Sequence, residues 1–231
     1  MIDFSIVLVS RSRPSMMLDL YRSIENTSTL NNEILIGLDN DDGNLHKYVD
    51  IFSDIDNVKL FIEDRNTNLH TRINQLLPHV KGKYIFVLND DCKLMDNSWD
   101  KYSIELLDYF GDVVYGKTYD NSIDRVSNTY AAFPIVSKTA AKKLGFIMDE
   151  TFGNHGSDVM TYRVYEGANK IVDLPGVRID HVLHNSEEAL QDRKKDKTAV
   201  DMINRTFSDN KFSVQKLFNI DISRFSQRLL K

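Results

Sequence analysis

Short apolar runs alternate with segments of helical periodicity along the first two-thirds of the chain. The runs are rich in β-branched and aromatic residues and end in polar turns, which is typical of buried strands. The segments between them space apolar residues three and four positions apart, as on one face of a helix. This pattern predicts strands at 4–9, 33–38, 58–62 and 84–88, and helices at 16–24, 45–52 and 69–80.

Strand, helix and strand repeated in this way predict a parallel sheet with right-handed crossovers and helices on both faces. All four predicted strands end in polar residues. The carboxyl ends of parallel strands meet at one edge of a sheet, and open α/β folds bind their ligands there. We therefore expect a binding site at that edge.

The pattern is looser in the second half of the chain. A capping serine and a closing glycine bound a short helix at 137–144, and Asn185-Ser-Glu-Glu is a capping box before a charged helix up to about residue 207. The apolar tail after residue 209 is expected to pack on the domain or to form a partner surface. Further expected helices are 99–110 and 158–167, and further expected strands are 113–116, 129–136, 170–174 and 177–182.

The composition and net charge of the chain limit the classes of protein to which it can belong. The 231 residues are 42% hydrophobic and 27% charged, as in an ordinary globular protein, and the net charge of −5 argues against nonspecific nucleic-acid binding. Cys92 is the one cysteine, which favours a reducing compartment. The opening segment carries Asp3 and no basic region, so it reads as a strand and not as a signal peptide. No run is long enough to span a membrane, and we expect a cytoplasmic protein.

The strand at 84–88 runs directly into Asn89, Asp90 and Asp91. Two adjacent acids at the end of a buried strand repel each other and favour a counter-ion. Mg²⁺ needs only one or two carboxylates besides substrate phosphates and water, so Asp91 is a candidate metal ligand. The competing interpretation is a turn with incidental acids.

Two further groups of polar residues are candidates for binding. Asp39, Asp41 and Asp42 follow a strand, where a carboxylate can accept a hydrogen bond from a nucleobase N–H, although an acidic turn is an alternative. Arg72 and Asn74 lie on the predicted helix at 69–80, off its apolar face. An arginine there can bind a diphosphate, or it can belong to a solvated helix face.

The second half contributes an acid and two histidines. Asp158 follows a glycine-rich loop at a helix start, so it is a candidate catalytic acid or base and equally a candidate helix cap. His181 and His184 lie near the end of a predicted strand, where two histidines raise the chance of a metal ligand. No zinc-type spacing is present.

These features, taken in order, resemble the GT-A glycosyltransferases, particularly the inverting family-2-like enzymes. The match covers about residues 3–185 and is far more specific than any one motif. It rests on Ser10-Arg-Ser-Arg-Pro14, the acid at Asp39 or Asp41, Asn66 to Asn74, Gly82-Lys-Tyr-Ile-Phe-Val-Leu-Asn-Asp-Asp91, Gly145-Phe-Ile-Met-Asp-Glu-Thr-Phe152, Ser157-Asp158, and Val177-Arg-Ile-Asp-His181.

The resemblance implies a fold and a division of the chain. The fold is α/β of the GT-A, Rossmann-like type: a mainly parallel sheet flanked by helices, with a C-terminal helical tail. Residues 1–185 would form the glycosyltransferase domain, with a nucleotide-binding half at about 1–95 and an acceptor and catalytic half at about 96–185. Residues 186–231 would form a helical extension that packs on the domain.

The resemblance also implies an activity and its residues. The enzyme would move a sugar from a nucleotide-diphosphate sugar to an acceptor hydroxyl with inversion. Asp158 would be the general base, and Asp91 with His181 or His184 would hold Mn²⁺ or Mg²⁺. The donor would contact Ser10, Arg11, Arg13, Asp39, Asp41, Asn66, Arg72, Asn74, Asn89 and Asp90. The acceptor would be a glycan, a lipid-linked molecule or a protein, and the tail from Phe212 to Leu230 could join copies of the chain.

Two departures keep other functions open. Asn89 replaces the first acid of the family's DxD motif, and Ser157 replaces the usual Glu before the base. A non-catalytic nucleotide-sugar-binding module would suit both changes. A nucleotidyltransferase on a similar sheet is the other alternative, but the turn after the first strand lacks the glycines that a triphosphate-binding loop needs.

Overall fold

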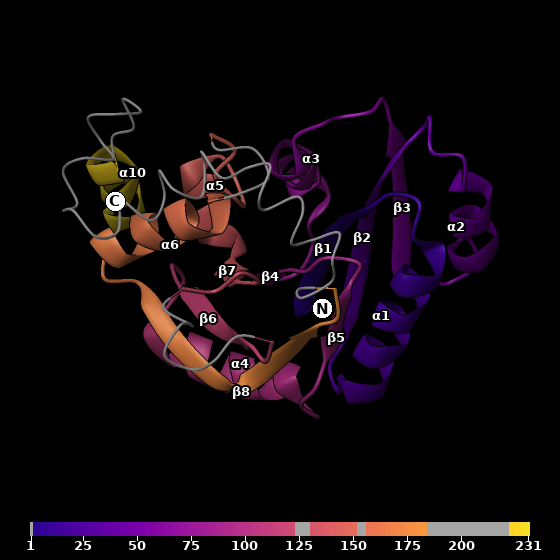
Figure 1. Ribbon diagram of the computed structural model, residues 1–231. Coiled ribbons are helices and arrows are strands. Elements are labelled where there is room, and N and C mark those ends of the chain that lie inside the picture. Colours follow the sequence, from indigo (N-terminus) through magenta and orange to yellow (C-terminus); the bar gives the residue numbers. More distant parts are fainter. Residues whose placement is uncertain (1, 123–129, 152–155, 184–221) are drawn as a thin grey trace.

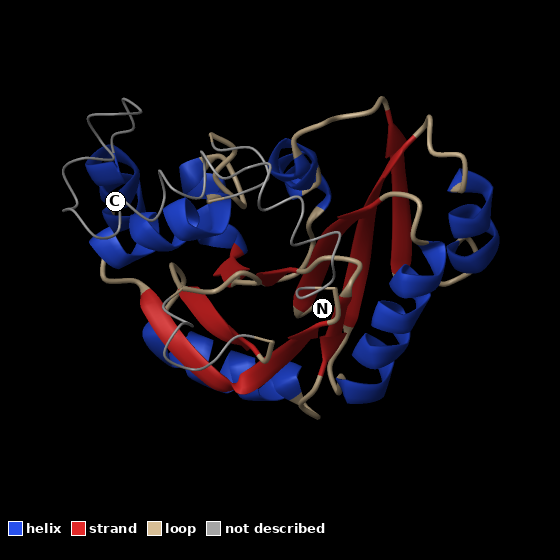
Figure 2. Cartoon of the chain, in the orientation of Figure 1, coloured by secondary structure: helices blue, strands red, loops and turns tan. Residues whose placement is uncertain are grey.

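The first half of the chain forms the predicted alternation of strands and helices. The computed structural model describes residues 2–122, 130–151, 156–183 and 222–231 (Figures 1 and 2). Capping is visible at α3, where the Asn68 side chain accepts from the N–H groups of His70 and Thr71. The elements of this half are β1 (Phe4–Ser10), α1 (Pro14–Thr27), β2 (Asn32–Asp39), α2 (Leu45–Phe52), β3 (Val58–Glu63), α3 (Leu69–Gln75), the 3-10 turn η1 (Leu77–His79) and β4 (Tyr84–Val87).

The second half adds shorter strands and the remaining helices. Its α5 begins at the predicted serine cap, because Ser137 Oγ accepts from the Ala140 N–H, and ends at Gly145 in the left-handed region at φ 87°. The elements are β5 (Cys92–Leu94), α4 (Trp99–Phe110), β6 (Tyr115–Asp120), β7 (Ile135–Ser137), α5 (Lys138–Leu144), α6 (Ser157–Gly167), β8 (Ile171–His181) and α10 (Ile222–Leu230).

The strands form one curled, mixed sheet in the order β3-β2-β1-β4-β7-β6-β8-β5. The β3-β2-β1-β4 half is parallel throughout, as predicted. The second half is mixed, because β7 runs antiparallel to β4 and β6, and β5 runs antiparallel to β8. Figure 1 shows β8 running along the lower edge of the molecule, from the second half of the sheet toward the parallel half. The expected α/β fold class is confirmed.

Side-chain alternation along the central strands builds a core on each face of the sheet. On β1, Phe4, Ile6 and Leu8 join the core that includes buried residues of α1, α2 and α4. Val7, between them, joins the core that includes residues of α3, α5 and α6. Helices therefore cover both faces, and polar side chains are left at the carboxyl edge of the parallel strands.

Several sequence-based assignments of elements were wrong. The strand expected over 113–116 is β6, which runs from Tyr115 to Asp120, and the described part of the one expected over 129–136 is strand only from Ile135, in β7. The helix expected over 69–80 ends at Gln75 and gives way to η1, because Pro78 cannot continue it. The two strands expected at 170–174 and 177–182 are one strand, β8, which passes through Pro175 and Gly176. Strand β5 was not expected, because three residues are too few to show a period. The capping box at 185 lies outside the described residues.

Asp100 ties α4 to the loop that precedes β2. Its side chain is completely buried and accepts hydrogen bonds from the backbone N–H groups of Thr29 and Leu30, both at 2.8 Å. It also accepts from Thr29 Oγ1, from Asn32 Nδ2 and from the Lys101 N–H. A carboxylate in the first turn of a helix is favoured by the helix dipole, and here it also satisfies a buried loop.

The tail helix α10 packs against α5 and α6. Ser226 Oγ donates to the Val164 carbonyl at 2.7 Å, Phe225 stacks edge-on against Phe146, and Leu229 is buried. Only residues 222–231 of the expected extension are among those described, so the extension over 186–231 and the division of the chain at about residues 95 and 185 stay predictions. Within the described residues, no helix combines the length and the apolar character needed to cross a membrane.

Candidate functional site

The turn after β1 is held in place by acids in the loops that follow two other strands, β2 and β4. Ser10 Oγ donates to Asp90 Oδ2 at 2.6 Å and lies 2.7 Å from the hydroxyl of the buried Tyr48. Ser12 adopts φ 62°, which residues other than glycine rarely do. Its N–H donates to Asp42 Oδ2 at 2.7 Å, and that bond holds the turn in this conformation.

Asp42 and Asp90 are therefore framework residues of this turn. Asp42 also accepts from the Asn44 N–H, which is the acidic turn considered as an alternative from the sequence. Asp90 is buried, and burial raises its pKa even though Ser10 and Arg13 stabilise the charged form. Arg13 reaches Asp90 Oδ1 at 3.3 Å. Both acids fix the backbone from which Arg11 and Arg13 project.

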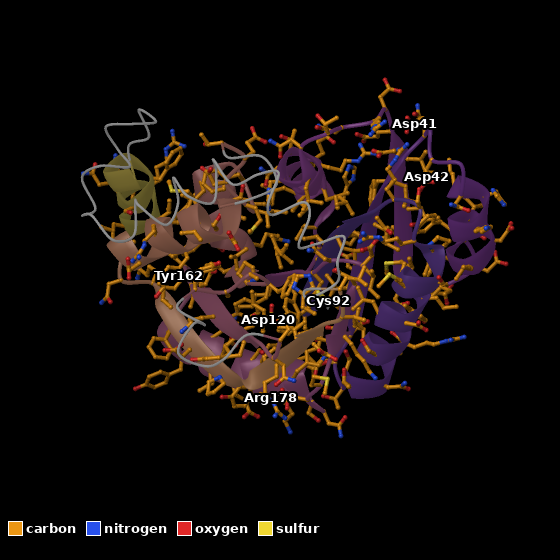
Figure 3. The ribbon with its side chains drawn as sticks, in the orientation of Figure 1. Asp41, Asp42, Cys92, Asp120, Tyr162 and Arg178 are labelled. Atoms are coloured by element: carbon orange, nitrogen blue, oxygen red, sulfur yellow. The ribbon has the colours of Figure 1, made fainter. Side chains whose placement is uncertain are left out.

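Arg11 bridges the two other acids that follow β2. Its guanidinium donates to Asp39 at 2.9 Å and also pairs with Asp41. The Asp39 side chain is only 13% exposed, whereas that of Asp41 is 46% exposed. Figure 3 shows Asp41 and Asp42 at the edge of the molecule formed by the loops after β2. Asp39 is thus the more buried of the two acids, and the Arg11 guanidinium is fixed beside it.

A cavity of about 570 Å³ lies at the carboxyl ends of β1, β2 and β4. It is open to solvent and large enough for a nucleotide, since small-molecule sites usually fall between about 300 and 1,000 Å³. Four arginines line it, which suits an anionic ligand. The predicted site residues that line it are Ser10, Arg11, Arg13, Asp39, Asn66, Arg72, Asn89, Asp90 and Asp91.

Arg72 is placed differently from the expectation. It was expected off the apolar face of its helix, but it is only 4% exposed. It donates to Glu63 at 2.7 Å and to the Leu38 carbonyl, and its buried Nε has no hydrogen-bond partner. These contacts put it beside the ends of β2 and β3, at the Asp39 end of the cavity, and not beside the acids that follow β4.

Asn74 does not line the cavity. Its side-chain oxygen accepts from the N–H groups of Ile147 and Met148, and its Nδ2 donates back to the Met148 carbonyl at 2.8 Å. This arrangement clamps the segment after α5 onto α3. The contacts give Asn74 a structural role, and its predicted contact with the donor stays a prediction.

The other end of the cavity contains Asp91, which is paired with His181. The distance from Asp91 Oδ2 to His181 Nε2 is 3.2 Å, and His181 Nδ1 lies 3.4 Å from Asp120 Oδ2. Burial opposes ionisation of Asp91, but His181 outweighs it and lowers the pKa of the carboxyl. Burial alone would lower the pKa of His181, yet Asp120 and Asp91 raise it to about 9.

Asp91 and His181 have the spacing of two ligands of one cation. Adjacent ligands of octahedral Mg²⁺, with bonds of about 2.1 Å, lie about 3 Å apart, close to the 3.2 Å observed. No three His, Cys, Asp or Glu side chains gather into a metal cluster in the described ranges. A cation here would thus take its other ligands from phosphate and water. His184, the alternative ligand, lies outside the described residues.

Asp158 lies in the first turn of α6, a helix on the side of the molecule opposite the β2 loops (Figure 1). Its Oδ1 accepts from the Val159 N–H at 2.8 Å. The carboxyl is partly buried, and burial raises its pKa to about 6. A carboxylate with this pKa is ionised at neutral pH and still basic enough to take a proton. Asp158 does not line the 570 Å³ cavity.

Sequence reasoning missed several residues of the site. Arg65 lines the cavity and Tyr48 holds the turn after β1, but a lone arginine in a loop and an apolar-face tyrosine in a helix give no signal. Asp120 was also missed, because its partner His181 is 61 residues away along the chain. Pairs of residues this far apart along the chain can be predicted only once the topology of the sheet is known.

Comparison with known proteins gives the family. The model of the family "Glycosyl transferase family 2" matches residues 5–165, well over half of the chain. No curated protein sequence matches.

Two solved structures share the fold at low identity. S. aureus TarS 1-349 in complex with UDP is 14% identical with a TM-score of 0.65, over 96% of this chain and 77% of that one. The mannosyltransferase PcManGT from Pyrobaculum calidifontis, in complex with GDP-Man and Mn²⁺, is 9% identical with a TM-score of 0.69, over 98% and 72%. From the extent of the family match and this shared fold, the chain belongs to glycosyl transferase family 2.

Proposed function

We propose that this chain moves a sugar from a nucleoside-diphosphate sugar to an acceptor hydroxyl, with a divalent cation and with inversion at the anomeric carbon. One observation carries the proposal. A single cavity is lined at one end by Asp39, which pairs with the Arg11 guanidinium, and at the other by Asp91, which lies at the spacing of a shared metal ligand from His181. A nucleoside diphosphate has its base and its charged phosphates at opposite ends in the same way.

The base would occupy the Asp39 end of the cavity. Asp39 can accept a ring N–H, and the Arg11 guanidinium beside it can donate to a neighbouring carbonyl. Uracil and guanine present such an N–H and C=O pair, whereas cytosine and adenine lack the N–H. The structures of TarS with UDP and of PcManGT with GDP-Man are consistent with either base.

The diphosphate would lie near Asp91, with Asn89 and Arg13 beside it. When bound, a divalent cation there would offset the charge that develops on the leaving diphosphate. Asp91 and His181 would hold that cation, and Arg13, which is fixed by Asp90, would add a second positive charge. Asp158 would take the proton from the acceptor hydroxyl as it attacks the sugar. Direct attack opposite the leaving group gives inversion.

Replacing Asp39 with alanine should weaken nucleotide binding without unfolding the protein. The lost hydrogen bond to a charged group is worth about 1.5–3 kcal/mol, or roughly 10- to 150-fold in Kd. The matched control is Asp50→Ala, which removes an exposed acid from the nearby α2. Isothermal titration with UDP and with GDP measures both variants. Unchanged affinity in Asp39→Ala would remove Asp39 from the base site.

The proposed function is tested first by thermal stabilisation. The protein is melted with UDP, GDP, CDP or TDP, each with Mn²⁺, Mg²⁺ or EDTA. A ligand at about a hundred times its Kd adds about 2.7 kcal/mol, which is a shift of several degrees for a chain of this size. We expect a metal-dependent shift with UDP or GDP, and the sugar nucleotides of that base are then assayed for transfer. Stabilisation without turnover on any acceptor would favour the non-catalytic module.

A further inference from the structure

Two buried carboxylates, of Asp91 and Asp120, and the half-buried His181 meet where β6, β8 and β5 lie side by side. These strands are consecutive in the sheet, and β8 is the middle one. His181 on β8 is in register with Cys92 on β5, and the Val182 N–H donates to the Asp91 carbonyl at 2.9 Å. On the other side, Asp120 on β6 is in register with Ile179. Backbone pairing therefore fixes the imidazole between two carboxylates.

The Asp120 carboxylate is itself held in one orientation. Its Oδ1 accepts from both the N–H and the hydroxyl of Ser122, and its Oδ2 lies 3.4 Å from His181 Nδ1. The Asp120 side chain is only 2% exposed. The ring of Phe133 packs edge-on against the imidazole, with centroids 5.0 Å apart, and restricts its rotation. Figure 3 shows Asp120 and Cys92 in this central region, away from the β2 loops.

The two nitrogens of a histidine ring have different roles when one of them binds a metal. The nitrogen that carries a proton is set by the hydrogen bond it makes, and the other nitrogen is then the metal ligand. We propose that Asp120 is a positioning residue, which holds the Nδ1 proton of His181 and so presents Nε2, next to Asp91, as a metal ligand. This inference rests on the proposed function and adds a residue to its machinery.

The arrangement supports His181 as a metal ligand. A metal-ligating histidine usually donates its second N–H to a carboxylate or a carbonyl, and His181 has such a partner in Asp120. Asp120 also connects a third strand, β6, to the site, so Asp91 and His181 are held 3.2 Å apart before a cation binds. A site prepared in this way loses less free energy to ordering on binding.

The test measures cation affinity, separately from transfer. Mn²⁺ binding is followed by isothermal titration and by electron paramagnetic resonance of free Mn²⁺, with saturating UDP and, in parallel, GDP. Asp120→Asn keeps the size of the side chain but removes its charge, and it should weaken Mn²⁺ binding roughly 10- to 100-fold. The matched control is Asp180→Asn, which removes the acid next to His181 from the opposite face of β8 and should bind Mn²⁺ as the wild type does.

The possible results separate this inference from the proposed function. If the wild type binds no Mn²⁺ with either nucleotide, both fail. If the wild type binds Mn²⁺, His181→Ala does not, and Asp120→Asn binds like the wild type, the positioning role alone is overturned. Equal losses in Asp120→Asn and Asp180→Asn would also overturn it, because they would reflect net charge. Melting temperatures of all variants are recorded, and a variant that melts early yet keeps its Mn²⁺ affinity counts against the role.

Discussion

Asp158→Asn should lower the rate of sugar transfer by roughly 10²- to 10⁴-fold, the usual contribution of a general base. The amide has the shape of the carboxyl and can still accept from the Val159 N–H, so the start of α6 should be kept. Nucleotide affinity should stay within about twofold, because Asp158 lies outside the cavity that we assign to the donor. Transfer kinetics and nucleotide titration on the same preparation measure both quantities.

The pH profile gives a second test of the same residue. Burial raises the pKa of Asp158 to about 6, and a general base works only when deprotonated. The wild-type kcat/KM should therefore fall as the pH drops below about 6 and level off above it. Glu166→Gln, which changes another acid of α6, should keep this profile. Transfer by Asp158→Asn at the wild-type rate would show that another group is the base.

Asp100→Ala should lower the free energy of unfolding by about 3–5 kcal/mol. The substitution leaves buried donors without an acceptor, including the backbone N–H groups of Thr29 and Leu30. Each unsatisfied buried group costs about 1–3 kcal/mol. For a chain of this length the melting temperature should drop by roughly 6–20 °C. Urea unfolding followed by circular dichroism measures the change.

The control for this experiment lies on the same helix. Glu105 is exposed on α4, so Glu105→Ala removes a negative charge without removing a buried acceptor, and its effect should stay within about 0.5 kcal/mol. Asp100→Asn should also be destabilised, since its amide group brings N–H donors toward other N–H donors. A wild-type urea midpoint for Asp100→Asn would mean that the charge and the second oxygen of Asp100 are dispensable.

The first half of the fold could be predicted because its signals are local. Strands β1 to β4 are apolar runs followed by polar turns, and each helix between them shows its period within one segment. The second half depends on pairing over long separations. Strand β5 exists because it pairs with β8, almost ninety residues away. No property of Cys92 to Leu94 alone predicts that partner.

Prediction of the site from the sequence is limited in the same way, because contacts between distant residues are not apparent in the sequence. The polar ends of neighbouring parallel strands had to meet, so the sequence could indicate that Asp39 and Asp91 share a cavity. It could not indicate which polar residues hold the others in place. Asp42 and Asp90 look like ligand-binding acids in the sequence but anchor the turn after β1, and Arg72 is buried because β2 offers it a carbonyl and β3 an acid.

The wall of the cavity near Arg72 depends on one position of β2. Gly37 lines the cavity, and a Cβ added there would meet Val9 Cγ1 at 3.0 Å and the stem of Arg72 at 3.3 Å. The Val9 and Arg72 side chains therefore pack directly against the main chain of β2 at this point. Even one methyl group on Gly37 would push against both of them and displace the stem of Arg72. The place of an arginine in the cavity wall thus depends on a missing side chain as well as on the acid and the carbonyl that the guanidinium contacts.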